Sequence, residues 1–181
     1  MTAPVEELKV RARLLRKALA AREPAALARA EATARQRRWP TGEGCSLSRC
    51  LNLVAVEAGF THWDHARTVL AGNARPGSDM GRFWYAPACA ALLNHWCTSL
   101  AEARLALAAA PGRYLLPYGR QFVVVETPFI AALGLDPDDP AWSALERDVA
   151  GGYGSAPWRV LAAARLAATR GNTGQAGHRP R

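Results

Sequence analysis

The sequence has no apolar run long enough to cross a membrane, because polar residues interrupt every run well short of about 20 residues. Its beginning also lacks the apolar core of a secretory signal, since Glu6 and Glu7 stand ahead of the first basic residues. No internal repeat is found, so a repeat architecture is not indicated. These absences predict a cytoplasmic protein that does not act at a membrane.

Cysteine is scarce, and no two of the four cysteines form a Cys-x-x-Cys pair. In a cytoplasmic chain the four side chains are expected to be thiols. One zinc arrangement can be drawn from the sequence, with Cys45, Cys50, Cys97 and His95. Apolar residues flank Cys89 and Cys97, however, which is more typical of buried small hydrophobic side chains. We therefore predict no metal site and no other cofactor.

Acidic residues are fewer than basic ones, at 15 against 23, and the net charge is +8. The excess is uneven, with +6 on residues 1–75, −3 on residues 76–150 and +5 on residues 151–181. Basic ends around an acidic middle suit a polyanionic partner. Arg outnumbers Lys by 21 to 2 and Ala is abundant, which is typical of a GC-rich bacterial genome. We favour this second interpretation, in which Arg is the ordinary exposed charge.

Half of the residues are hydrophobic, and 181 residues are enough to bury a core without disulfides or metals. Apolar residues at helical spacing predict a four-helix N-terminal module over residues 4–72. Its first helix is expected over residues 4–22, with Ala, Leu, Arg and Lys predominating. The second is expected to begin at Glu23-Pro24, since proline suits the first turn, and to end near Arg38.

The third and fourth helices of this module form a closely spaced pair. Ser46 or Ser48 is expected to cap the third helix, because a hydroxyl can accept a free amide of the first turn. Gly59 is placed to end it in the left-handed conformation that glycine adopts most readily. Thr61 is expected to cap the fourth helix, and Gly72 to end it.

Residues 1–70 resemble a helical module found ahead of some ankyrin-repeat proteins and some glyoxalase-related bacterial proteins. The resemblance lies in a basic leading helix, a Pro-Ala-Ala-Leu start, a Gly-Phe helix end and a Trp-containing helix. The corresponding residues here are Leu8–Ala21, Pro24–Arg29, Leu51–Phe60 and Trp63. Neither ankyrin repeats nor glyoxalase metal ligands are present, so the resemblance implies a helical fold and no activity.

The helix pair admits two interpretations. In the first, Phe60 and Trp63 are core residues at a helix corner, as large aromatics beside a tight turn usually are. In the second, the pair is a helix-turn-helix that binds nucleic acid, although the carboxylate of Asp64 would repel phosphates. The candidate nucleic-acid contacts are then Thr61, His62 and Arg67 on the recognition helix and Arg11 on the first helix.

The second half is expected to be a small α+β unit of residues 80–170. Residues 73–79 are polar and rich in turn formers, which predicts a linker. Pro87 is expected to open a long helix to about Ala110. Shorter helices are expected from Thr127-Pro128 to Gly134, from Asp139-Pro140 through Val149, and after Ser155, with a disordered tail over residues 171–181. The segment from Leu93 through Trp142 resembles an uncharacterised bacterial module.

A β-hairpin is predicted over residues 114–126, with strands 114–118 and 121–126 joined by the turn Gly119-Arg120. Pro117 places its strand at an edge, since proline donates no hydrogen bond to a neighbouring strand. Alternation puts Phe122 and Val124 on the face opposite to Gln121, Val123 and Val125. Tyr and Arg near the hairpin tip can bind a protein or single-stranded nucleic acid. The other interpretation, which we favour for these residues, is packing of the aromatic rings beside a solvent-facing turn.

Evidence for catalysis is weak, and the question of an enzyme stays open. His95 is expected in the middle of a helix, with no Ser or Cys nucleophile recognisable beside it. Asp136, Asp138 and Asp139 lack the later glycine and glutamate of an EF-hand loop. The glycines of residues 151–154 do not follow a strand with dinucleotide-binding spacing.

We therefore expect a mainly α protein, in which an N-terminal helical bundle with a helix-turn-helix-like pair precedes a small α+β unit with one β-hairpin. Our leading functional prediction is a cytoplasmic, non-enzymatic interaction module that binds a protein partner. Its candidate contact residues are Trp63, Tyr118 and Arg120. The alternative is a nucleic-acid-binding regulatory protein.

Overall fold

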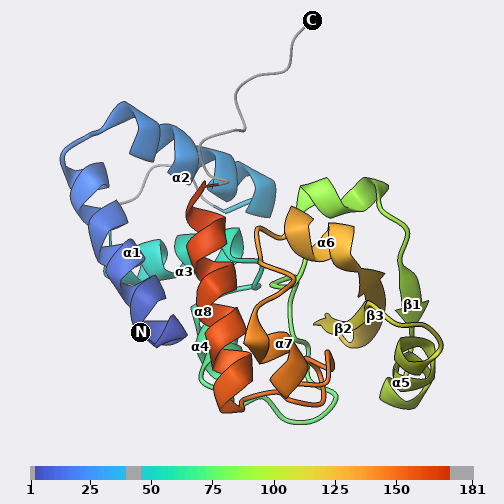
Figure 1. The fold of residues 1–181 in the computed structure, drawn as a ribbon. Coiled ribbons are helices and arrows are strands. Elements are labelled where there is room, and N and C mark those ends of the chain that lie inside the picture. The colour runs from blue at the N-terminus through green and yellow to red at the C-terminus, as the bar shows by residue number, and fades with distance from the viewer. Residues whose placement is uncertain (1–2, 40–45, 172–181) are drawn as a thin grey trace, which may run out of the picture.

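The computed structural model describes residues 3–39 and 46–171. It confirms the expected fold class, a mainly α chain whose N-terminal helical bundle precedes a small sheet with a hairpin (Figure 1). The elements of the first half are α1 (Pro4–Ala20), α2 (Pro24–Arg37), α3 (Leu47–Glu57) and α4 (Trp63–Leu70). The second half contains η1 (Pro87–Ala91), β1 (His95–Cys97), α5 (Leu100–Ala108), β2 (Arg113–Tyr118), β3 (Gln121–Glu126), α6 (Thr127–Ala132), α7 (Pro140–Ala144) and α8 (Ala156–Gly171). Across these residues no helix combines the length and apolar character that a membrane crossing requires.

The caps of the helix pair agree only in part with expectation. The Ser46 hydroxyl caps α3 by accepting the Arg49 N–H at 3.2 Å, and Gly59 ends the helix with φ of 96°. The cap of α4 is His62 and not Thr61, because the His62 ring nitrogen accepts the His65 N–H at 3.1 Å. Thr61 instead directs its hydroxyl to the ring of His65, at 2.8 Å.

The prediction of one long helix from Pro87 to Ala110 is wrong. The chain forms a short 3₁₀ helix, then the strand β1, then a separate helix α5. Ser99 starts α5 by accepting the Glu102 N–H, and Glu102 accepts the Thr98 N–H in return, at 3.2 and 3.0 Å. This reciprocal cap, with the pairing of β1 to β3, outweighs the helical propensity of the Ala- and Leu-rich sequence. His95 therefore lies on a strand.

The sheet has three antiparallel strands in the order β1-β3-β2, so that β3 is central and β2 forms an edge, as Pro117 predicts. Gly119 and Arg120 form the predicted two-residue turn between Tyr118 and Gln121. The two faces follow the predicted alternation. Val123 and Val125 belong to the main core, whereas Val124 packs in a smaller cluster beneath α5.

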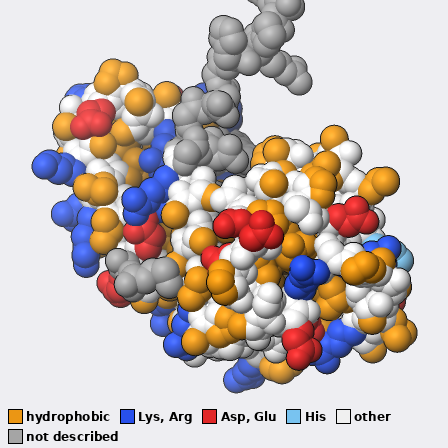
Figure 2. All heavy atoms as spheres, in the orientation of Figure 1, with side chains coloured by type: hydrophobic (Ala, Val, Ile, Leu, Met, Phe, Trp, Pro, Cys, Tyr) orange, Lys and Arg blue, Asp and Glu red, His pale blue; other side chains and the backbone are white. Residues whose placement is uncertain are grey.

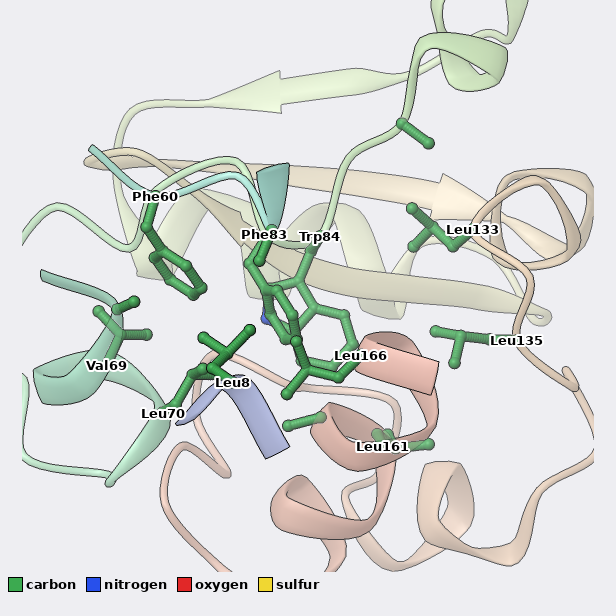
Figure 3. Close-up of a cluster of buried hydrophobic side chains, with 14 of the residues drawn as sticks. Leu8, Phe60, Val69, Leu70, Phe83, Trp84, Leu133, Leu135, Leu161 and Leu166 are labelled. Carbon is green, nitrogen blue, oxygen red and sulfur yellow. The ribbon is translucent and has the colours of Figure 1, made fainter. Parts of the chain in front are cut away.

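One hydrophobic core joins the two halves of the chain. It includes residues of α1, α3, α4, the sheet and α8, and α8 contacts α1 directly. Figure 3 shows Leu8 and Phe60 gathered with Phe83, Trp84 and Leu166. The segment 73–79 has no helix or strand, and the Ala74 N–H donates to the Tyr153 hydroxyl at 3.0 Å. Cys45 and residues 172–181 of the expected tail lie outside the described residues.

The helix expected from Asp139-Pro140 through Val149 is shorter than predicted. It ends at Ala144 as α7, and Glu146 and Arg147 follow with positive φ values of 51° and 61°. Two left-handed residues cannot continue a right-handed helix. They redirect the backbone so that the Leu115 N–H donates to the Arg147 carbonyl at 2.9 Å, and the Val149 N–H to the Leu115 carbonyl at 3.0 Å.

Arg165 of α8 is buried inside this core, with 5% of its surface exposed. Its guanidinium donates to three backbone carbonyls, of Phe83 at 3.0 Å, Leu133 at 2.8 Å and Tyr85 at 2.9 Å. Burial lowers its pKa to about 10, against a smaller opposing effect of Cys89, so the group stays protonated at neutral pH. A cation in this position connects α8 to two other segments through their backbone.

Replacement of Arg165 by Met should lower the free energy of unfolding by about 2–4 kcal/mol, because three buried carbonyls lose their donors. Urea denaturation measures the loss. Arg159→Met is the matched control, since Arg159 is exposed on the same helix and its replacement should change stability by less than about 0.5 kcal/mol. Equal stability of the two variants would contradict a structural role for the guanidinium.

The turn between α3 and α4 lies directly against the backbone of residues 81 and 82, which belong to the second half of the chain. The Arg82 N–H donates to the Gly59 carbonyl at 2.7 Å, and the Gly119 N–H donates to the Gly81 carbonyl at 2.8 Å. A Cβ on Gly81 would lie 2.8 Å from the Gly59 oxygen, and its φ is 68°. The α3–α4 turn is thereby held to the tip of the β2–β3 hairpin.

Gly81→Ala should destabilise the protein more than Gly77→Ala does. Both glycines have positive φ, but a Cβ on Gly77 would meet nothing within 4 Å. Gly77→Ala should therefore lower the free energy of unfolding only by the cost of a left-handed backbone for alanine, about 1–2 kcal/mol. Gly81→Ala should lose a further ~1–3 kcal/mol from overlap with Gly59. Thermal and urea denaturation of the two variants would reveal the difference, and equal losses would rule out a tight contact between Gly81 and Gly59.

Candidate functional site

An aromatic chain leads from the core to the surface beside the hairpin turn. Phe129 is buried, and its ring contacts Tyr85 edge-on at 6.2 Å between centroids. Tyr85 contacts Tyr118 at 5.5 Å, and Tyr118 contacts Trp96 at 5.0 Å. All three are edge-to-face contacts, the geometry that aromatic quadrupoles favour. Trp96, at the outer end, is 44% exposed.

Two arginines accompany this chain. The guanidinium of Arg82 lies over the Tyr118 ring, 5.7 Å from its centroid, and Arg120 is exposed in the hairpin turn. In the described part of the chain neither guanidinium forms an ion pair. One carboxylate is near, since Asp79 lies beside Gly119, but it accepts the Gly81 N–H at 2.7 Å. We call Arg82, Tyr85, Trp96, Tyr118 and Arg120 the hairpin-tip surface.

Trp96, Tyr85 and Arg82 were not predicted as contact residues, whereas Tyr118 and Arg120 were. Trp96 falls within the long helix that was expected from Pro87 and that does not form. Because β1 pairs with β3, Trp96 lies opposite Val123 and on the same side of the sheet as Tyr118. Only the pairing of strands distant in sequence brings these side chains together.

Trp63, the other predicted partner contact, belongs to a different part of the surface. It is half-buried at the start of α4, packs against the main core, and its backbone N–H donates to the Asn52 side chain at 2.8 Å. Within the described chain its ring makes no contact with Tyr118. Phe60 is fully buried and stacks on Phe83 at 5.4 Å, as expected for a core residue at a helix corner.

The predicted nucleic-acid contacts of α4 divide between its start, where Thr61 and His62 lie, and its last turn, where Arg67 lies. Thr61, His62 and Arg67 are exposed, and Arg67 reaches Asp64 at 3.4 Å. His65 is held in place, because its Nε2–H donates to the Asp79 carbonyl and its Nδ1 accepts from Thr61, each at 2.8 Å. A groove of about 480 Å³ runs between α4 and residues 73–79. Asp64 and Asp79 both line it.

Arg11, the remaining predicted nucleic-acid contact, is occupied by contacts inside the molecule. It donates to Glu7 at 2.7 Å and to the Thr169 hydroxyl at 2.8 Å, and it also reaches the Leu166 carbonyl. These bonds connect α1 to α8. Other basic residues of α1 remain at the surface, and Figure 2 shows Lys and Arg side chains gathered over this helix.

A second group of polar side chains lies where β1 meets α5. A ring nitrogen of His95, the sulfur of Cys97 and a carboxylate oxygen of Glu102 lie within 4.8 Å of one another. Burial raises the pKa of the Cys97 thiol, and the Glu102 carboxylate raises it further. Cys50, Cys89 and Cys97 are buried, and Cys89 and Cys97 are free thiols, as predicted. The Glu102 contact was not predicted, because Glu102 follows Cys97 only after a change from strand to helix.

Glu7→Gln should weaken the contact between α1 and α8 in a pH-dependent way. Burial raises the pKa of Glu7, but hydrogen bonds from Arg170 and Arg11 outweigh it, so its pKa is lowered in the folded state. The wild-type advantage should be complete above the ordinary value of 4.5 and be lost as pH falls through the lowered pKa. Urea midpoints at about pH 6 and about pH 3 test this. Glu6→Gln, at an exposed pair with Lys9, is the control.

Comparisons with known proteins supply no relative for this site. No family model, no curated protein and no solved structure matches the chain. The resemblance of residues 1–70 to the module that precedes ankyrin-repeat and glyoxalase-related proteins therefore stays a prediction. The candidate functional regions of the chain are the hairpin-tip surface, the exposed side of α4 and the polar group at β1 and α5.

Proposed function

We propose that the chain is a cytoplasmic, non-enzymatic interaction module that binds a protein partner through the hairpin-tip surface. The observation that carries the proposal is the position of Trp96. Of the six tryptophans, three are buried, two are half-buried and Trp96 alone is exposed. An exposed indole packed edge-on against Tyr118, whose ring also lies under the Arg82 guanidinium, has the composition of a binding hot spot.

The surface is also preorganised. Trp96 rests on Tyr118, Tyr118 rests on Tyr85, and Tyr85 rests on the buried Phe129, so the exposed ring is supported from the core outward. The hairpin turn is fixed as well, because Gly119 exchanges two backbone hydrogen bonds with residues 80 and 81, of 2.7 and 2.8 Å. A surface already ordered in this way loses little conformational entropy when a partner binds.

The charges indicate what kind of partner fits. Arg82 and Arg120 have no ion-pair partner among the described residues, and the Asp79 carboxylate is engaged by a backbone N–H. A complementary segment would present an apolar side chain to Trp96 and carboxylates to the two guanidinium groups. We therefore propose an acidic segment with an apolar anchor as the ligand.

Nucleic acid is the less favoured ligand. Thr61 and His62 are exposed at the start of α4 and Arg67 in its last turn, which supports this alternative, as does the net charge of +8. However, Asp64 and Asp79 line the adjoining groove, where phosphates would meet carboxylates. Arg11 is bound to Glu7 and α8 and is not free to reach a phosphate.

Trp96→Ala should weaken ligand binding by about tenfold or more, equivalent to ~1.4 kcal/mol, because the exposed ring is the expected anchor. The ligands would be acidic peptides selected from a random displayed library against the full chain, and isothermal titration would measure their affinities. Leu105→Ala is the matched control, since Leu105 is 75% exposed on α5, on the other side of the sheet. Peptide affinities that fall equally in both variants would contradict the proposal.

The same proteins should be titrated against duplex DNA, single-stranded DNA and RNA at about 0.15 M salt. The proposal expects no binding that depends on Arg67 under these conditions. Binding that persists at this salt concentration and weakens on Arg67→Ala would favour the nucleic-acid alternative.

A further inference from the structure

We propose that His95, Cys97 and Glu102 form a binding site for a divalent transition metal, with Zn²⁺ as the best-suited ion. The site lies on the face of β1 that α5 covers, away from the aromatic chain. It is separate from the proposed partner contact, so that each proposal can fail without the other.

The strand places two of the three ligands. His95 and Cys97 are two residues apart, so they lie on the same side of β1, opposite Val124 and Phe122 of β3. Trp96 between them points to the other side, toward Tyr118. The strand therefore separates a nitrogen and sulfur pair on one face from the exposed indole on the other.

The start of α5 places the third ligand. Glu102 stands three residues after the cap Ser99, and its Oε2 accepts the Thr98 N–H at 3.0 Å. This bond holds the carboxylate in position beside the other two ligands. Outer hydrogen bonds of this kind orient metal-binding carboxylates in known sites.

The distances suit a small ion after slight adjustment. The three donor atoms lie within 4.8 Å of one another. Zinc bonds of about 2.0–2.3 Å in a tetrahedral arrangement put neighbouring donors roughly 3.5 Å apart. Cys97 is 1% exposed and Glu102 is held by the Thr98 N–H, so the exposed His95 side chain makes most of the remaining adjustment.

The donor types select the ion. A thiolate, an imidazole and a carboxylate suit Zn²⁺, while Ca²⁺ and Mg²⁺ require oxygen ligands alone. When the Cys97 thiol gives up its proton, the thiolate and the carboxylate together carry two negative charges, which Zn²⁺ neutralises at this half-buried position. Three protein ligands leave a fourth position for water or for a donor from another molecule.

Cobalt titration of the reduced, metal-free full chain tests the site, because a thiolate bound to Co²⁺ gives a near-ultraviolet charge-transfer band. We expect a band that saturates at one equivalent, is abolished by Zn²⁺ and is absent in Cys97→Ala. His95→Ala and Glu102→Gln should each weaken cobalt affinity by more than about tenfold. Both replaced side chains are exposed, and glutamine can still accept the Thr98 N–H, so these two variants keep the fold.

The matched controls are Cys89→Ala for a buried thiol, His62→Asn for an exposed histidine at a helix cap, and Glu126→Gln for an exposed carboxylate. All three should bind Co²⁺ as the wild type does. Three results would overturn the proposal: no charge-transfer band in the wild type, a band that survives Cys97→Ala, or unchanged affinity in folded His95→Ala and Glu102→Gln. Far-ultraviolet circular dichroism verifies that each variant is folded.

Discussion

The buried guanidinium of Arg165 is the constraint on which the rest of this structure depends. A cation in an apolar core must find acceptors, and here these are the carbonyls of residues 83, 85 and 133. The segment after the helix pair and the end of α6 must therefore converge on α8. The same bonds fix residues 83–85, which position Tyr85 against Tyr118. Arg165 therefore stabilises the packing of the core and also the segment that supports the aromatic surface.

Much of the fold could be predicted because it depends on interactions between residues that are close together in the sequence. Proline starts, serine caps and apolar residues at helical spacing identify α1 to α3, and a two-residue turn between β-branched runs identifies the hairpin. The strand β1 could not be found in this way, since it has three residues and depends on pairing with β3, whose partner residues lie 25 to 29 positions later. Arg165 was also missed, because arginine on a helix is usually solvated.

The candidate sites likewise contain some residues that local sequence patterns identify and others that only tertiary contacts bring together. Tyr118 and Arg120 follow from the hairpin pattern, whereas Trp96 and Arg82 join them only through tertiary contacts. The three proposed metal ligands near β1 could not be recognised in the sequence, for a geometric reason. On the helix expected there, residues 95 and 97 would project about 200° apart. On a strand they share a side, and the cap of α5 brings Glu102 to them.

The uneven burial of the six tryptophans has a practical consequence. Trp84, Trp142 and Trp158 are almost completely shielded from water, and Trp39 and Trp63 are half-shielded, so a soluble quencher such as iodide reaches Trp96 first. Emission from the native chain therefore contains one readily accessible fluorophore, located at the outer end of the aromatic chain. Its accessibility reports events at that end without any added label, while the remaining indoles report on the integrity of the fold.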